Sequence, residues 1–352
     1  MRYIIIMCML VFGCKPNANN TTIQQETINR YKIKDKKLYG YIDTNGVIVI
    51  KPKFIVAGNF SEGLAPVCMS GSVSLDTFYG DYPVVFPKIN GMYGYINDEG
   101  KYVIQPQFDL CLPFNNGMAV VNNNNSYGYI DNKGKIVIKL IYDNAFSFTG
   151  DYAAVEINNK YGFIDKKGVV RIKPQYSYAE SFQNSVAIVC IGDTWPLKMG
   201  LINKRGKYIV KPIYDNIMSM HNNRAVFQLN NKYGYMDENG TIIIQPKYLS
   251  ASNYYNGIAW VLEDSLFNII NLNGDCIKKT NYESVGVFSY GLAPVKVGNK
   301  WGYCNTIGEI VIQPQYIKVE PFRGALAMVW FEDRVGYINK KSKLVWSADT
   351  GI

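Results

Sequence analysis

The sequence has 352 residues, of which 14% are aromatic and 18% are charged, and its formal net charge is +9. The charged fraction is below the average for a soluble domain, and length alone would predict two domains. Beyond residue 60 the cysteines are odd in number and irregular in spacing, which excludes a disulfide framework or a regularly spaced metal site. We expect them to be buried apolar side chains, although an exported protein could still pair two of them: Cys68, Cys111, Cys190, Cys276 and Cys304.

The chain begins with a segment typical of a secretory signal. Arg2 precedes an apolar run over residues 3–12, which is too short to span a bilayer. The run ends in LVFGC, which resembles a bacterial lipobox whose cysteine, Cys14, becomes the lipidated first mature residue. We therefore expect residues 1–13 to be a signal peptide and Cys14 to be the site of lipid attachment. The alternative is an ordinary signal peptide that contains a cysteine by chance.

Residues 14–30 are polar and lack apolar periodicity, so we expect a flexible, lipid-anchored tether. Two or three acyl chains on Cys14 would hold the protein stably on a membrane. The protein is thus expected to be exported and anchored in the bacterial cell envelope, on the periplasmic side or at the cell surface. That location disfavours nucleic acid as a partner.

From residue 31 to residue 346 one unit is written nine times. Each copy has an aromatic residue and a glycine, then Asp or Asn, a second glycine and an apolar run closed by Lys-Pro or Gln-Pro, as in WGYCNTIGEIVIQPQY at 301–316. The first glycine marks each copy, with Asn268 replacing it once: Gly40, Gly94, Gly128, Gly162, Gly200, Gly234, Gly302 and Gly336. Successive markers are 34 residues apart, except for steps of 54 and 38 at two inserts.

A second half of the unit recurs in phase. Twenty residues after the marker comes an aromatic residue, such as Phe60 or Phe322, which Met220 replaces in the fifth copy. Five residues further on there is always an alanine: Ala65, Ala119, Ala153, Ala187, Ala225, Ala259, Ala293 and Ala327.

These motifs resemble the WG (KWG) repeat family of bacterial proteins over roughly residues 31–346. Tyrosine replaces the family's tryptophan in five copies, and only Trp301 keeps it. The resemblance implies a β-repeat architecture. For function it implies an interaction module rather than a defined activity.

Each repeat is predicted to form a three-stranded antiparallel meander. In the eighth copy the strands would cover residues 295–297, 301–304 and 309–312, joined first by a two-residue Gly-Asn turn and then by a turn in which Asn305 caps its own backbone. Pro314 has no N–H to donate and should end the third strand. The marker glycine should permit the close approach of a neighbouring backbone or aromatic ring.

Nine meanders would stack into one all-β unit with a continuous core, because three strands alone are marginal in water. The array opens with a first strand at Tyr31 and ends near Trp346, after a third strand, so no strand is left to exchange between the chain ends. We therefore expect an open, twisted, solenoid-like array, with a closed propeller-like ring as the alternative. Residues 347–352 would be a C-terminal tail.

Two inserts, near residues 68–88 and 192–196, interrupt the same turn between the first and second strands of a meander. They should project from the same edge of the array, three units apart. Exposed aromatic side chains are common binding anchors, so we expect these inserts to bind a partner through Phe78, Tyr79, Tyr82, Phe86 and Trp195. The alternative is that these rings fold back over the edge of the array.

Lysines also recur at fixed repeat positions, such as Lys51, Lys139, Lys173 and Lys211. The pattern predicts one solvated face. A basic stripe could in addition attract an acidic polymer.

Catalysis, cofactors and metals are not expected. His221 is the single histidine, and no nucleophile, phosphate-binding or zinc motif accompanies it. The sequence therefore favours a non-enzymatic, membrane-anchored protein that binds a protein or a polysaccharide. One alternative is an envelope scaffold without a specific ligand. A less favoured one is a glycan hydrolase that uses the insert carboxylates Asp76 and Asp81.

Overall fold

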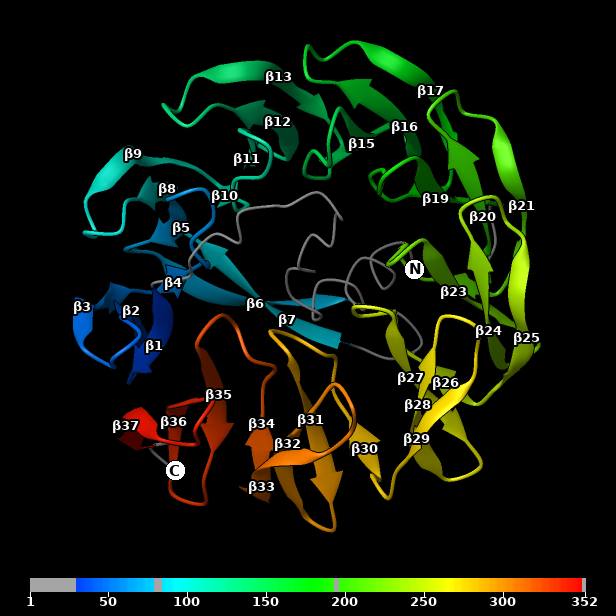
Figure 1. Ribbon diagram of the computed structural model, residues 1–352. Coiled ribbons are helices and arrows are strands. Elements are labelled where there is room, and N and C mark those ends of the chain that lie inside the picture. Colours follow the sequence, from blue (N-terminus) through cyan, green and yellow to red (C-terminus); the bar gives the residue numbers. More distant parts are fainter. Residues whose placement is uncertain (1–29, 79–83, 193–195, 350–352) are drawn as a thin grey trace.

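The computed structural model describes residues 30–78, 84–192 and 196–349, and gives only the backbone for residues 73–78 and 84–89. Every regular element in these ranges is a β-strand. Figure 1 shows nine small sheets arranged as blades around a common axis, with the last blade beside the first. No helix of the described ranges is long and apolar enough to cross a membrane. The prediction of an all-β unit of nine repeats is confirmed.

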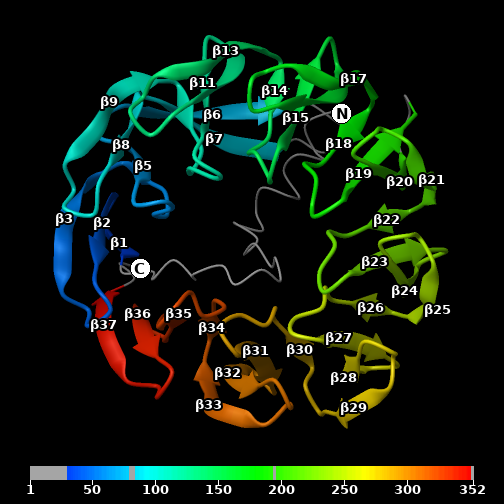
Figure 2. The ribbon, with the colours of Figure 1, turned by 45° about the horizontal axis from the view of Figure 1, so that its top comes forward.

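Blades 2 to 9 each have four antiparallel strands, and blade 1 has three. The innermost strands lie nearest the axis (Figure 2): β4 (Val56–Ala57), β10 (Leu110–Cys111), β14 (Asn144–Ala145), β18 (Tyr178–Ala179), β22 (Asn216–Ile217), β26 (Ser250–Ala251), β30 (Ser284–Val285) and β34 (Lys318–Val319). The second strands are β1 (Tyr31–Asp35), β5 (Ala65–Cys68), β11 (Ala119–Asn123), β15 (Tyr152–Ile157), β19 (Val186–Ile191), β23 (Arg224–Leu229), β27 (Ile258–Glu263), β31 (Leu292–Val297) and β35 (Leu326–Trp330).

The third strands carry the marker glycines: β2 (Leu38–Ile42), β8 (Tyr93–Ile96), β12 (Ser126–Ile130), β16 (Lys160–Asp165), β20 (Lys198–Asn203), β24 (Lys232–Asp237), β28 (Leu266–Asn271), β32 (Lys300–Asn305) and β36 (Arg334–Asn339). The outer strands form the rim: β3 (Ile48–Phe54), β9 (Tyr102–Phe108), β13 (Ile136–Tyr142), β17 (Val170–Tyr176), β21 (Tyr208–Tyr214), β25 (Ile242–Tyr248), β29 (Cys276–Lys279), β33 (Ile310–Tyr316) and β37 (Leu344–Asp349).

The predicted three-stranded meander is correct for blade 1. In the other blades the prediction misses the innermost strand. After each outer strand the chain crosses to the next blade and pairs over only two residues, as where Leu110 faces Asn122 and Cys111 faces Val121. Two residues are too few to show an alternating pattern in the sequence. This crossover links each blade to the next.

Each marker glycine except Gly336 lies where the outer strand bulges. In blade 4 three residues of the outer strand, 173–175, oppose the single residue Gly162. A Cβ added to Gly162 would lie 2.6 Å from the carbonyl oxygen of Ile172 and 2.7 Å from the nitrogen of Pro174. The predicted close approach is confirmed, but the neighbour is backbone and not an aromatic ring.

The proline of the Lys/Gln-Pro motif lies inside this bulge. Pro314 falls between the paired residues Ile312 and Tyr316, so β33 continues past the proline and the predicted strand end is wrong. A bulge leaves residues outside the ladder, where a missing N–H is tolerated. In blade 7 the marker glycine and the bulge opposite it are both missing. Asn268 replaces the glycine there, and it pairs directly with Lys279 without the bulge.

The Asp/Asn turns form as predicted. Oδ1 of Asn305 accepts hydrogen bonds from the backbone N–H groups of Ile307 and Glu309, at 3.1 and 2.9 Å. Gly308 completes the turn with φ of +76°, a value that favours glycine. Asp43 makes the equivalent pair of bonds in blade 1. In both turns a side-chain oxygen stabilises its own backbone.

Buried tyrosine hydroxyl groups join consecutive blades. Tyr41 of blade 1 donates a 2.7 Å hydrogen bond to the carbonyl oxygen of Gly58 in blade 2, and its ring packs on Phe60 with the centroids 4.9 Å apart. Four further junctions have the same hydrogen bond, donated by Tyr95, Tyr129, Tyr235 and Tyr303. Burial raises the pKa of all five tyrosines, so the hydroxyl groups stay protonated and can donate.

The same contact closes the ring. Tyr337 of blade 9 donates a 2.8 Å hydrogen bond to the carbonyl oxygen of Lys32 in blade 1. The ring of Tyr31 packs on Tyr337 with the centroids 5.7 Å apart, and its hydroxyl accepts a 2.9 Å bond from the N–H of Ala325. Blade 9 therefore meets blade 1 through a tyrosine–carbonyl bond and an aromatic pair, as the other blades meet one another.

Tyr31 occupies the position that alanine holds in the other eight repeats. It faces Ile42 across the first two strands of blade 1, as Ala65 faces Ile96 in blade 2. In the later blades the aromatic partner comes from a loop residue such as Phe114, which packs in one cluster with Ala119. In blade 1 the larger side chain of Tyr31 supplies that ring from the strand itself.

The expected open, solenoid-like array is therefore wrong, and the alternative of a closed propeller-like ring is correct. The premise that no strand is exchanged does hold, because blade 1 uses only β1 to β3 and blade 9 only β34 to β37. Closure needs two complementary faces and not a shared strand. The outer strand of blade 9 also runs to Asp349, into the predicted tail.

Replacing Tyr337 with Phe removes the hydroxyl group that closes the ring. We expect the free energy of unfolding to fall by about 1–2 kcal/mol, because the carbonyl of Lys32 loses its donor. Phe163 occupies the equivalent place in blade 4, so the ring itself fits. Tyr303→Phe, which removes the same bond between blades 8 and 9, is the matched control. Denaturant unfolding followed by fluorescence measures both; an open array would lose stability only in Tyr303→Phe.

Replacing Gly234 with Ala tests the coupling of glycine and bulge. The new Cβ would lie 2.5 Å from the carbonyl oxygen of Ile244, so we expect a loss of about 2–3 kcal/mol in the free energy of unfolding. Asn268→Ala, at the same repeat position without a bulge, should cost less than about 1 kcal/mol. Equal losses in the two variants would contradict the coupling.

Candidate functional site

The two inserts leave the same face of the ring. Antiparallel strands alternate in direction, so all connections between second and third strands open on one face and all Asp/Asn turns on the other. The long insert joins β5 to β8 in blade 2, and the short one joins β19 to β20 in blade 5. We call the first of these surfaces the insert face.

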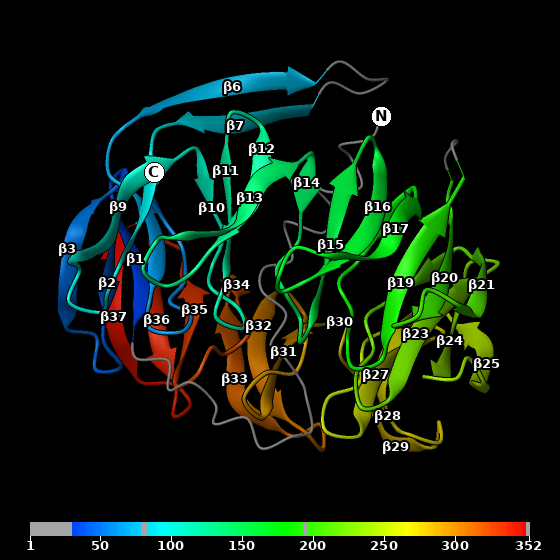
Figure 3. The same cartoon turned by 90° about the horizontal axis from the view of Figure 1, so that it is seen from above.

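The long insert forms a β-hairpin, whereas only a loop is predicted from the sequence. Its strands β6 (Ser72–Phe78) and β7 (Val84–Asn90) pair in register from Ser72 opposite Asn90 to Phe78 opposite Val84. Among the strands that the structure describes, neither pairs with any other. Figure 3 shows the hairpin lying across the insert face. The alternation in SVSLDTF is the signal that could have predicted a strand here.

A narrow neck fixes where the hairpin leaves blade 2. A Cβ added to Gly91 would lie 2.7 Å from Sγ of Cys68, and it would also press on the carbonyl oxygen of Ser70. The thiol of Cys68 donates a 3.3 Å hydrogen bond to that same carbonyl oxygen. The neck therefore accepts only glycine at this position.

The predicted binding residues belong to these inserts. Phe78 ends β6, and Phe86 faces Asp76 across the hairpin; for all three the structure gives the backbone only. The remaining candidates lie outside the described residues: Tyr79, Tyr82 and Trp195. The same holds for the second candidate carboxylate, Asp81, and for Cys14.

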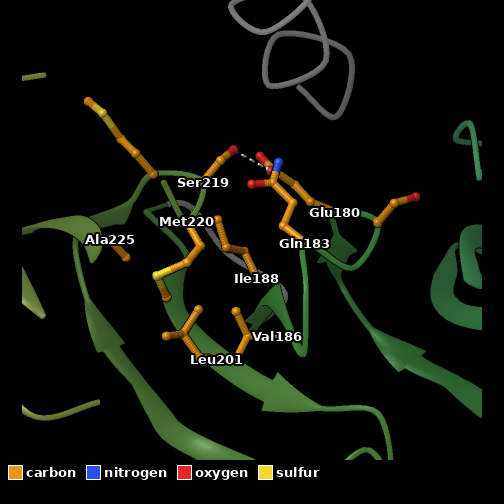
Figure 4. A pocket seen from close by; sticks show the side chains of 10 residues that line it. Glu180, Gln183, Val186, Ile188, Leu201, Ser219, Met220 and Ala225 are labelled. Carbon is orange, nitrogen blue, oxygen red and sulfur yellow. Dashed lines mark hydrogen bonds between the residues drawn. The ribbon is translucent and has the colours of Figure 1, made fainter. Parts of the chain in front are cut away.

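A small cavity lies at the junction of blades 5 and 6 (Figure 4). Here the repeat's tyrosine is replaced by Leu201 and its aromatic partner by Met220, so both the ring pair and the interblade hydrogen bond are lost. The resulting cavity has a volume of about 10 Å³, and Ser219 beside it lies 3.4 Å from a carboxylate oxygen of Glu180. That volume holds about one water molecule, so the cavity suits no larger ligand.

His221 lies in the loop between β22 and β23. Its backbone N–H and carbonyl groups bond those of Arg224 at 2.8 and 2.9 Å, which closes the tight turn that other blades also have. Across the described residues, no group of three or more His, Cys, Asp or Glu side chains could hold a metal ion.

The five cysteines of the described ranges carry free thiols. Four are buried, as predicted, and burial raises the pKa of Cys111, Cys190 and Cys304 to about 12. Cys276 is exposed, so the prediction of a buried side chain is wrong there. Its strand β29 is exposed throughout, because the degraded seventh repeat lacks the buried aliphatic residue of the other outer strands.

The ring of repeated four-stranded blades defines a β-propeller-like repeat protein. The family model for the WG-containing repeat matches the chain eight times, at residues 39–71, 93–127, 127–161, 161–195, 199–233, 233–267, 269–301 and 301–329. The chain belongs to this WG repeat family. The predicted family is thereby confirmed.

Comparison with solved structures finds similar chains at low sequence identity. A eukaryotic initiation factor is 10% identical with a TM-score of 0.61, over 91% of this chain and 95% of that one. A functionally unknown protein from Desulfotomaculum acetoxidans is 13% identical with a TM-score of 0.34, over 67% of this chain and 93% of that one. PorZ, a surface component of the type-IX secretion system of Porphyromonas gingivalis, is 8% identical with a TM-score of 0.31, over 91% of this chain and 52% of that one. Among curated proteins, none matches the sequence. The first likeness supports the fold alone.

The junction of blades 5 and 6 should gain stability when the repeat is restored. In Leu201→Tyr with Met220→Phe, the new hydroxyl group would reach the carbonyl of Met218, the equivalent of Gly58. We expect an increase of about 1 kcal/mol in the free energy of unfolding and a higher melting temperature. Calorimetry measures both. A lower melting temperature would mean that the side chains around the cavity cannot accommodate the two rings.

Proposed function

We propose that this chain is a non-enzymatic binding protein that captures a protein or polysaccharide partner on its insert face. The observation that carries the proposal is the β6–β7 hairpin. It is absent from the other repeats, it lies across one face of a rigid ring, and both of its edges are unpaired within the described chain. Function concentrates in loops that a rigid framework positions.

The hairpin has little support of its own. An isolated two-stranded hairpin is marginally stable in water, and an unpaired edge offers backbone N–H and carbonyl groups to a further strand. A bound partner would therefore stabilise the hairpin as well as contact its aromatic residues. The proposed anchors are Phe78, Tyr79, Tyr82 and Phe86, with Trp195 on the same face.

We further propose that the protein is exported and held on a membrane of the bacterial cell envelope by lipid on Cys14. The apolar run and the lipobox-like LVFGC support this proposal. A polar tether over residues 14–30 would leave the ring, which begins at Tyr31, free to orient toward a partner.

The hairpin should be dispensable for folding and necessary for binding. In blade 4 the same connection is the two-residue turn Asn158–Asn159, both with positive φ. Replacing residues 70–91 by Asn-Asn should change the melting temperature by only a few degrees and abolish partner capture from detergent-solubilised envelopes. Replacing Asp264–Ser265, the same turn in blade 7, by Asn-Asn is the control. Unchanged capture with a large drop in melting temperature would make the hairpin a structural cover, as expected of a scaffold without a specific ligand.

Cys14 should carry the lipid. Metabolic labelling with palmitate should mark the intact protein, and Cys14→Ala should lose the label and leave the membrane fraction. Cys8→Ala, which alters the cysteine inside the apolar run, should keep the label. Label that persists in Cys14→Ala would contradict the proposed anchor.

A further inference from the structure

Positive charge is concentrated on three adjacent blades. In blades 3, 4 and 5 the ten-residue windows over the Asp/Asn turn and most of the outer strand, residues 131–140, 165–174 and 203–212, together carry eleven Lys and Arg residues, all exposed. The same ten-residue window in blade 2 holds one lysine and two carboxylates, and in blades 6 and 8 it holds carboxylates only. The charge is therefore a property of this arc of the ring and not of the repeat.

The two carboxylates within the arc are already engaged. Asp165 accepts a 2.7 Å hydrogen bond from Nε of Arg171. Oδ1 of Asp131 accepts the backbone N–H groups of Lys133 and Lys135 at 3.0 and 2.9 Å. Blade 5 has Asn203 in place of the turn aspartate. Lys204 lies 3.9 Å from a carboxylate oxygen of Asp151, outside the windows. Eleven cations against the two carboxylates of the windows still leave a strong excess of positive charge.

One lysine position recurs in the three outer strands. Alternate residues share a strand face, so Val137 and Lys139 of β13 lie together on the face opposite the buried Ile138, and Lys135 lies in the turn just before the strand. Val169, Arg171 and Lys173 in blade 4, and Lys207, Ile209 and Lys211 in blade 5, occupy the same places. Lys139, Lys173 and Lys211 therefore occupy one position in three consecutive blades, and a second cation precedes each by two or four residues, which gives a row of positive charge that a linear polyanion complements.

We propose that this arc of blades 3, 4 and 5 is a binding surface for a linear polysaccharide that carries sulfate, phosphate or carboxylate groups. The surface lies on the rim and on the side opposite the insert face, so it is a second site and does not depend on the function proposed for the hairpin.

A flat anionic membrane fits the arc less well. Lys135 belongs to the turn at the edge of the ring, whereas Lys139 lies roughly 13 Å further along the outer wall. A flexible chain can follow both surfaces, and a bilayer cannot cover both. Docking by the whole turn-bearing face would also place Asp98, Glu99 and Glu238 of the flanking blades against the anionic surface.

Single-stranded nucleic acid also fits less well. Its binding surfaces interleave basic residues with aromatic rings on which bases stack. In the three ten-residue windows the only aromatic residue is Tyr208.

The repeat itself supplies variants that should fold. Gln105, Gln245 and Gln313 occupy the position of Lys139, Lys173 and Lys211 in other blades. The arc variant is therefore Lys139→Gln, Lys173→Gln and Lys211→Gln. The control variant removes three exposed lysines from the isolated basic hairpin of blade 9: Lys340→Gln, Lys341→Gln and Lys343→Gln. Both variants lower the net charge by the same amount.

Binding to dextran sulfate, with uncharged dextran as the blank, tests the proposal by calorimetry at low and high salt. The Kd of the parent protein should rise with salt. The arc variant should bind at least fivefold more weakly, the control variant less than twofold more weakly, and both should keep the parent melting temperature. Replacing residues 70–91 by Asn-Asn should leave this Kd unchanged. Equal losses in the arc and control variants would overturn the proposal, as would preferential binding to anionic phospholipid vesicles or single-stranded DNA.

Discussion

The ring depends on buried contacts between consecutive blades, and at six of its nine junctions these include a hydrogen bond from a third-strand tyrosine hydroxyl group to a carbonyl of the next blade. A single blade of three or four short strands is marginal in water, so its stability must come from its neighbours. The hydroxyl bond adds about 1 kcal/mol net, and the aromatic pair beside it adds about 0.5–1.5 kcal/mol beyond area burial. Burial of the blade faces contributes more in total, but it has no direction. Where it is present, the bond orients one blade against the next, because a hydrogen bond is directional.

The junctions without this bond show what replaces it. In blade 4 Phe163 keeps the ring pair with Phe182, at 4.8 Å between centroids, but has no hydroxyl group. In blade 7 Ile269 replaces the tyrosine, and Trp260 stacks on Phe288, with the rings 5.1 Å apart and 5° from parallel. There Tyr282, which follows the outer strand, donates a buried 2.9 Å hydrogen bond to the carbonyl of Gly308 in blade 8. The junction of blades 5 and 6 has no aromatic residue at either position and contains the cavity. Aromatic packing is thus interchangeable, and the third-strand tyrosine is the part most often replaced.

The local features of the fold could be predicted from the sequence because each depends on residues close together in the chain. The turn at Asn305, the glycine at Gly162 and the register of the inserts all follow from the period. The bulge at Pro314 could not, since it depends on how the outer strand passes the glycine. Closure depends on a small rotation at each junction, which no periodicity reveals. Tyr31 was the available signal: it is a tyrosine where eight repeats have alanine. For the candidate site, the phase of the repeat located the inserts. Hairpin pairing depends on residues outside the repeat, and the charge of one arc depends on residues that differ from one repeat to the next.

Closure without a shared strand affects the order in which the junctions between blades form during folding. Most junctions join neighbouring repeats, so the distance along the chain is short and the entropy of bringing the partners together is small. At the last junction the hydrogen bonds of Ala325 and Tyr337 join residues 294 and 305 positions apart. Eight junctions can therefore form in any order, and the ninth must wait until the row of nine blades has bent into a ring. Until then the faces around Tyr31 and Tyr337 stay exposed, and each complements the opposite end of another chain. At high concentration the same face that completes one ring can begin a larger assembly.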